Sequence, residues 1–131
     1  MWHNIEQRNL FVTPVLKKVY VDEKPTGLIM LYSNASALPE YSDMNPSRQE
    51  YFAIDKNIFY KLQKHKLLVN HNEYEGLYCL EVWKYNPEIL TKQLPGNTQV
   101  VDPLSLYLSL KDIRDERIEM ALKQIIDKTI W

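Results

Sequence analysis

The most informative segment of the sequence runs from Asp102 to Ile126 and reads DPLSLYLSLKDIRDERIEMALKQII. Its first two residues, Asp102 and Pro103, predict the start of a helix. The aspartate carboxylate can accept a free backbone N–H there, and a proline at the first helical position loses no hydrogen bond. Val101 and Leu106 flank this start at the spacing of a hydrophobic staple. We therefore expect a helix to begin next to Asp102.

A second helix is expected in the same segment, with Asp115 as its N-terminal cap. Glu119 and Lys123 stand four residues apart, in the order that favours a helical ion pair. The apolar stripe of this helix consists of Ile118, Ala121, Leu122, Ile125 and Ile126. The apolar face of the first helix consists of Leu104, Tyr107 and Leu108. Together these patterns predict a C-terminal helical pair.

Shorter elements are expected upstream. Residues 18–21 and 50–54 have the composition of strands, and Asp55 can cap a following helix. The apolar face of that helix consists of Ile58, Phe59 and Leu62. Residues 28–32 form an apolar run that fits either a buried strand or the entry to a helix. Residues 33–38 favour a short helix, with Pro39 tolerated in its first turn.

Residues 67–69 and 77–85 read as two strands joined in a hairpin by the polar stretch 70–76. A turn is expected at residues 94–97. At 131 residues, without repeats or a linker, the chain has the length of one domain, which buries roughly two thirds of its unfolded surface. We expect a single compact α+β domain over residues 1–131, in which a small mixed or antiparallel sheet packs against the C-terminal helical pair.

Composition limits the compartments and partners of the chain. Lys and Arg number 16 and Asp and Glu number 17, so no net positive charge draws the chain onto nucleic acid or anionic lipid. The single cysteine, Cys79, cannot form an internal disulfide, which suits a reducing compartment. Residues 1–8 are polar, unlike a secretory signal, and the longest apolar run is far shorter than the roughly 20 residues of a membrane helix. We expect a cytoplasmic protein with no membrane contact.

No residues have the spacing of a known catalytic or metal centre. The three histidines, at positions 3, 65 and 71, are scattered, and we favour exposed positions for them. Cys79 is best interpreted as a buried core residue, and the three glycines form no phosphate-binding loop. Glu81 and Lys84 are residues that a nuclease could use, yet positions three apart on a strand point to opposite faces. We therefore predict no catalytic residue, no metal ligand and no cofactor.

Two groups of side chains remain as candidate binding surfaces. Glu81, Trp83 and Tyr85 share one face of a predicted strand and could line a ligand or partner surface, although core filling is the simpler interpretation. The second group is a local basic patch for nucleic-acid contact, made of Lys17, Lys18, Lys61 and Lys64. The balanced net charge argues against tight binding of nucleic acid by this patch.

Four segments together resemble a bacterial family. They are PVLKKVYV at residues 14–21, SALPEYSDMN at 36–45 with YFAI at 51–54, LEVWKY at 80–85 and VDPLSLYLSL at 101–110. In this order they resemble the region that follows the winged helix-turn-helix in MarR-like or abortive-infection antitoxin-like (AbiEi-type) regulators. The resemblance covers most of the chain and carries over no functional residue, because the segments are strands and helix starts.

The resemblance implies an accessory domain of a transcriptional regulator or antitoxin, without the DNA-binding reader, for which residues 1–13 are too few. Such a domain is non-enzymatic and mediates dimerisation, partner binding or effector sensing. Its partner would be a protein or a second copy, with nucleic acid bound only through an upstream domain or the local lysine patch. The alternative interpretation is an enzyme of unknown chemistry, such as a nuclease or nucleotidyl-transfer relative, whose acids converge only on folding.

Overall fold

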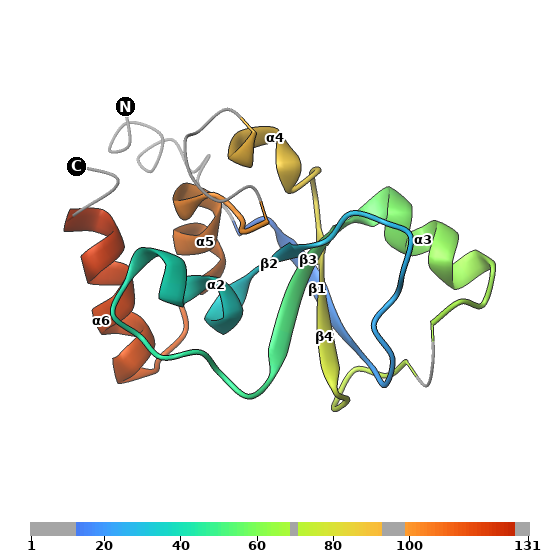
Figure 1. The fold of residues 1–131 in the computed structure, drawn as a ribbon, viewed down its shortest axis with the longest axis horizontal. Helices are drawn as coiled ribbons and strands as arrows, with labels where there is room; N and C mark the ends of the chain where they lie inside the picture. Colours follow the sequence, from blue (N-terminus) through green and yellow to red (C-terminus); the bar gives the residue numbers. More distant parts are fainter. Residues whose placement is uncertain (1–12, 69–70, 93–98, 128–131) are drawn as a thin grey trace.

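Strand β4 (Tyr78–Trp83) is an inner strand of the sheet and organises the fold (Figure 1). The computed structural model describes residues 13–68, 71–92 and 99–127, and within them the sheet has four strands in the order β1-β4-β3-β2. β1 (Val15–Val21) is antiparallel to β4, and β3 (Glu50–Asp55) is parallel to it. β2 (Leu31–Tyr32) is antiparallel to β3. The predicted α+β class, with a mixed sheet, is confirmed.

The sequence of β4 suits an inner position, because five of its six side chains are buried. Its parallel neighbour β3 precedes it in the chain, and a helix lies between the two strands, as is usual for adjacent parallel strands. Alternation along β4 sends Leu80 and Val82 to one side of the sheet. Cys79, Glu81 and Trp83 point to the other side. The alternating sequence of β4 therefore gives the two sides of the sheet different chemistry.

Helix α3 (Lys56–Lys64) covers the side of the sheet that carries Leu80 and Val82, which we call the α3 side. Asp55 caps this helix by accepting the backbone N–H of Asn57, as predicted. The buried residues here are all apolar: Val19, Val21, Phe52, Ile54, Phe59, Leu62, Leu68, Leu80 and Val82. Hydrophobic burial thus holds α3 on the sheet.

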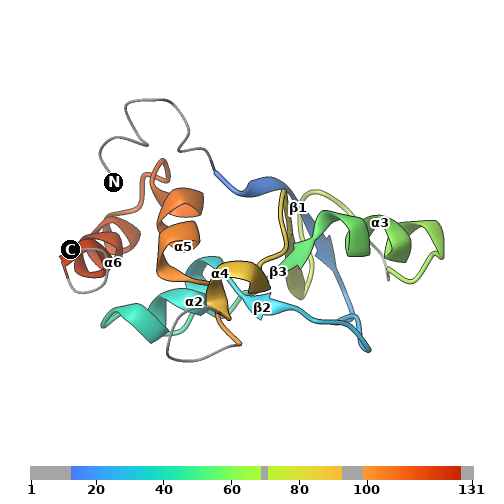
Figure 2. The same cartoon turned by 90° about the horizontal axis from the view of Figure 1, so that it is seen from above.

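Helices α2 (Asn34–Tyr41), α5 (Pro103–Leu110) and α6 (Glu116–Ile125) lie together on the opposite side from α3 (Figure 2). We call this the three-helix side. Its buried apolar residues are Leu31, Ala37, Leu38, Ala53, Trp83, Val100, Val101, Leu106, Leu110, Ile118, Ala121, Leu122 and Ile125. Polar side chains are buried there as well, and they form the contacts described below.

The C-terminal helical pair begins at the predicted caps. Asp102 Oδ2 accepts the backbone N–H of Ser105 at 2.8 Å, and Asp115 Oδ1 accepts that of Arg117 at 2.9 Å. The predicted stripe of α6 is confirmed, since Ile118, Ala121, Leu122 and Ile125 are buried and Ile126 is partly buried. The strands at residues 18–21 and 50–54 are also confirmed, each as part of a slightly longer strand.

The residues predicted to form the buried face of α5 are wrong. Leu104, Tyr107 and Leu108 are only partly buried, whereas the buried side chains are Pro103, Ser105, Leu106 and Leu110. Apolar residues occur all round this helix, so their spacing alone does not select the inner face. Contacts with α2 and α6 select it instead.

The predicted hairpin between residues 67–69 and 77–85 is also wrong. Leu67 and Leu68 are not in a strand, and the Leu67 N–H instead donates to the Leu62 carbonyl at the end of α3. Val69 and the predicted turn at 94–97 lie outside the described residues. The second predicted strand is real but ends at Trp83, and it pairs with β1 and β3. So short an apolar run cannot be assigned by periodicity.

Of residues 28–32, only Leu31 and Tyr32 form a strand, β2, so the strand alternative is correct for these two residues, and Ile29 before them is exposed. The helix expected at 33–38 is present as α2, but Pro39 is its sixth residue and lies outside its first turn. A short helix that no sequence pattern predicts, α4 (Glu88–Thr91), follows β4. Within the described ranges, no helix is long and apolar enough to span a membrane.

Candidate functional site

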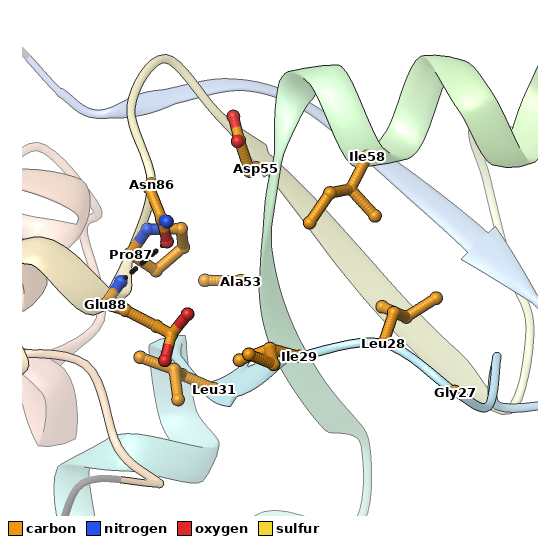
Figure 3. Close-up of a pocket in the computed structure, with 10 residues that line it drawn as sticks. All are labelled: Gly27, Leu28, Ile29, Leu31, Ala53, Asp55, Ile58, Asn86, Pro87 and Glu88. Carbon is orange, nitrogen blue, oxygen red and sulfur yellow. Dashed lines mark hydrogen bonds between the residues drawn. The ribbon is translucent and has the colours of Figure 1, made fainter.

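A pocket of about 370 Å³ lies at the carboxyl ends of the two parallel strands (Figure 3). β3 ends there at Asp55, and the segment that follows β4 brings Asn86, Pro87 and Glu88 to the same place. Residues 27–31, which lead into β2, form the third wall. In sheets with parallel strands, ligands commonly bind beyond the carboxyl ends of the strands. The position and size of this pocket make it the candidate site.

Three polar side chains, Asp55, Asn86 and Glu88, border the pocket at different places (Figure 3). Asp55 caps α3 through a long bond, 3.4 Å from its Oδ1 to the Asn57 nitrogen, so its carboxylate keeps most of its accepting capacity. Asn86 Oδ1 accepts the backbone N–H of Glu88 at 3.0 Å, which fixes the start of α4. The Glu88 carboxylate lies 3.2 Å from the Lys92 ammonium, one helical turn further on. Two carboxylates therefore border the same cavity.

Apolar side chains form the rest of the wall. Leu31 and Ala53 are buried at the floor, and Leu28 and Ile58 face the pocket from the side away from the acids (Figure 3). Ile29 is 54% exposed although it is fully apolar. The pocket thus combines an open apolar wall with fixed negative charge, the usual composition of a site for an amphipathic ligand.

The ionisable groups of the pocket are its two carboxylates, Asp55 and Glu88. Its ten lining residues include no histidine, cysteine, serine, threonine or lysine. Among the residues that the structure describes, no group of three or more His, Cys, Asp or Glu side chains is placed to hold a metal ion. Two carboxylates and an amide oxygen can, however, accept hydrogen bonds from a cationic group.

A second polar group, centred on Glu81, is closed to solvent on the three-helix side. Glu81 Oε2 accepts a hydrogen bond from Asn34 Nδ2 at 3.0 Å, and Oε1 accepts one from Trp83 Nε1 at 3.3 Å. Asn34 begins α2 with φ of 49°, in the left-handed region that asparagine tolerates better than most residues. All three side chains are buried. They cross-link α2 to β4, and this cross-link is structural.

A third group surrounds the buried Asp102 at the start of α5. Burial raises the pKa of the Asp102 carboxyl, and its hydrogen bonds with Ser105 oppose the shift only in part. Ser105 Oγ shares a hydrogen bond of 2.5 Å with the Tyr85 hydroxyl, and the Tyr41 hydroxyl donates to the Val101 carbonyl at 2.8 Å. Burial, with the charge of Asp102 second, raises the pKa of Tyr41 to about 12. These bonds join α5 to the segment that follows β4, and α2 to the segment that precedes α5.

Cys79 is fully buried on β4, as the sequence indicates. Burial raises the pKa of its thiol to about 12, with a further contribution from the nearby Glu81. The thiol therefore stays protonated at neutral pH and does not act as a nucleophile there.

The residues suggested as a partner surface are mostly inaccessible. Glu81 and Trp83 are fully buried, and Tyr85, whose ring packs edge-on against Trp83 at 5.7 Å, is half-buried. They do share one side of the sheet, but α2 and α5 contact them there through Asn34 and Ser105. In this structure they fill the core and form no open surface.

The four suggested lysines do not form one patch. Lys61 and Lys64 are exposed on the last turn of α3, and Lys17 lies on the same side of the sheet, 4.9 Å from the centre of the Phe59 ring. Lys18 follows Lys17 on β1 and therefore points to the three-helix side. Three of the four lysines, Lys17, Lys61 and Lys64, thus lie on the α3 side of the sheet.

Sequence reasoning missed the pocket. It assigned Asp55 only a capping role and did not single out Ile29, Asn86 or Glu88. The sequence did contain one signal: an acid stands at or soon after the end of each strand, Asp55 for the first and Glu88 for the second. That signal becomes informative only when the two strands are known to be parallel neighbours, which the predicted hairpin obscured.

No protein-family model, no curated protein and no solved structure matches this chain.

Proposed function

We propose that this chain is a non-enzymatic, partner-binding accessory domain of a cytoplasmic transcriptional regulator or antitoxin. The observation that carries the proposal is the pocket at the carboxyl ends of β3 and β4. It presents Asp55 and Glu88 together with the exposed apolar side chain of Ile29, a combination of groups suited to recognition of a partner.

The remaining acids and the thiol support the same interpretation. Glu81 accepts hydrogen bonds from Asn34 and Trp83 inside the core, and Asp102 caps α5. Cys79 is buried with a protonated thiol. Groups that a catalytic site would need to expose are thus used in holding the helices on the sheet.

The enzyme alternative has one observation in its favour, since Asp55 and Glu88 line one cavity and Lys92 pairs with Glu88. Metal-dependent nucleases use such sets of acids and a lysine. Glu81 and Lys84, the pair considered from the sequence, do not form one, because Glu81 is buried and Lys84 is exposed.

The test has two parts. The tagged chain is co-expressed with the products of the genes that flank its own, and complexes are measured by size-exclusion chromatography with light scattering. We expect a stoichiometric complex with a flanking gene product or a defined homodimer. A strictly monomeric chain that binds neither product would contradict a partner-binding role.

In the second part, the purified chain is incubated with labelled DNA, RNA and nucleoside triphosphates in Mg²⁺ or Mn²⁺. We expect no turnover. Cleavage or nucleotidyl transfer that disappears in the double variant Asp55→Asn/Glu88→Gln would establish the enzyme alternative and refute the proposal.

A further inference from the structure

We infer that the pocket receives a basic side chain, arginine in preference to lysine, carried by an extended segment of the partner protein. This inference rests on the proposed function and names the chemistry of the partner. The cationic head would pair with the Glu88 carboxylate, with Asp55 as a second negative charge at the border of the pocket, and the methylene stem would lie along Leu28, Ile29 and Ile58.

Charge is the first argument. Asp55 and Glu88 are the only charged residues among the ten that line the pocket, and both are acidic. Asn86 adds an amide oxygen at the border of the pocket (Figure 3). The N-terminus of α3 would by itself attract an anion, but Asp55 already occupies it as the cap. The pocket therefore selects a cation.

The chain itself already pairs one cation, the Lys92 ammonium, with the Glu88 carboxylate. This ammonium lies 3.2 Å from the carboxylate, and the Lys92 side chain is 66% exposed against 16% for Glu88. An ion pair with so exposed a lysine contributes little to stability, so an incoming cation can replace it at small cost. Lys92 is thus a weak competitor for the same carboxylate.

The apolar wall explains why the cation should be a long side chain. Lys and Arg bury their methylene stems against apolar surface while the charged head reaches a polar partner. Leu28 and Ile58 face the cavity opposite the acids, and Ile29 is more than half exposed at its edge (Figure 3). A small metal ion or ammonium would leave this apolar surface uncovered.

Arginine is preferred over lysine because a guanidinium is planar and offers several donors at once. It can bond both oxygens of one carboxylate, whereas an ammonium acts as a point charge. Arginine is also enriched in protein interfaces, where lysine is depleted. An exposed Ile29 beside the pocket supplies apolar surface for the backbone that carries the side chain.

The test is an NMR titration of the ¹⁵N-labelled full chain with four probes: acetyl-Gly-Gly-Arg-Gly-Gly-amide, its Lys and citrulline counterparts, and spermidine. We expect shifts confined to the amides around Ile29, Asp55 and Glu88. The Arg peptide should bind most tightly, and the uncharged citrulline peptide about tenfold more weakly or worse. Equal binding of the citrulline peptide, or no binding of any peptide, would overturn the inference. Spermidine binding as tight as that of the Arg peptide would overturn the assignment to a protein partner.

Variants make the test specific. Asp55→Asn removes the charge but keeps a good helix cap, and Glu88→Gln keeps the shape of the side chain. Each should weaken the Arg peptide about tenfold, whereas Lys92→Ala should strengthen it by removing the competitor. The matched control is Glu73→Gln, at an exposed acid outside the pocket, which should change nothing. Equal weakening by Glu73→Gln, or no effect of Lys92→Ala, would count against the site.

The peptide titration and the test of the proposed function can fail independently of each other. Loss of the charge selectivity removes only the inference about the basic side chain and leaves partner binding open to the co-expression experiment. Metal-dependent turnover by the pocket would instead refute the proposed function even if the Arg peptide binds.

Discussion

The two sides of the sheet are built by different physical means. On the α3 side, the buried cluster contains only apolar side chains, with Phe59 and Leu62 of α3 packed on Leu80 and Val82 of β4. On the three-helix side, the same strand contributes Glu81, and polar contacts join the helices to it. A single strand therefore serves two cores with opposite requirements.

The two sides of the sheet are therefore expected to respond differently to substitutions. An apolar cluster depends on buried area and packing, so a shape-conserving change costs little. A buried polar contact depends on every donor having its acceptor, because one unpaired buried group is costly. Within the described residues, the three-helix side already contains two buried side-chain oxygens without a hydrogen-bond partner, Ser33 Oγ and Asp102 Oδ1.

The largest effect is expected on the α3 side from Phe59→Ala. Removing a ring that is 1% exposed should lower the free energy of unfolding by about 3–5 kcal/mol, measured by urea denaturation. The matched variant Phe59→Leu keeps much of the volume and should lose far less. Equal losses in the two variants would show that this side does not depend on packing volume.

A somewhat smaller effect is expected on the three-helix side from Glu81→Leu. The apolar side chain leaves Asn34 Nδ2 and Trp83 Nε1 without acceptors, and the loss of these bonds should lower the free energy of unfolding by about 1–3 kcal/mol in all. Glu81→Gln keeps one acceptor oxygen and should lose roughly half as much in the same denaturation experiment. If Glu81→Leu is as stable as the parent, the polar contacts do not stabilise this side.

A finer comparison separates the hydrogen bond of Asn34 from its backbone conformation. Asn34→Gly and Asn34→Ala both lose the bond to Glu81. Only alanine must also adopt the left-handed φ of 49°, which costs roughly 1–2 kcal/mol. The glycine variant should therefore melt at the higher temperature. The reverse order would indicate that the start of α2 changes its backbone when the side chain is removed.

The smallest effect is a pH dependence at Asp102. Its pKa is raised by burial, so the folded state binds the proton more tightly than the unfolded state, whose carboxyl has its ordinary pKa near 3.8. The stability that this group contributes is present below 3.8 and is lost as the pH rises through the raised folded pKa. Asp102→Asn keeps a cap but does not titrate.

The measurement for Asp102 is urea denaturation of the parent and the Asp102→Asn variant from about pH 3.5 to neutrality, a range that begins below the ordinary pKa of 3.8. The parent should lose stability relative to the variant as the pH rises through this range. A parent that gains stability relative to the variant would mean that the capping bonds outweigh burial and that the pKa is lowered.

Local features were predictable from the sequence. Asp55, Asp102 and Asp115 all cap helices where the sequence places them, because a cap is formed by a side chain and a backbone N–H two or three residues away. The stripe of α6 was predictable for the same reason, since its spacing is fixed by the helix itself. The candidate site was not, because Asp55 and Glu88 line one pocket only after two distant strands pair.

The sequence alone determined where α3, α5 and α6 begin, which residues of β4 alternate between the two sides, and the α+β class, because each depends on neighbours within a few residues. The tertiary structure alone decided that β4 lies between β1 and a parallel β3, that Leu106 and Leu110 are the inner face of α5, and that an acidic pocket forms beyond the strand ends. Those features depend on contacts between segments far apart in the chain, and a short apolar segment can satisfy its backbone with several alternative partners.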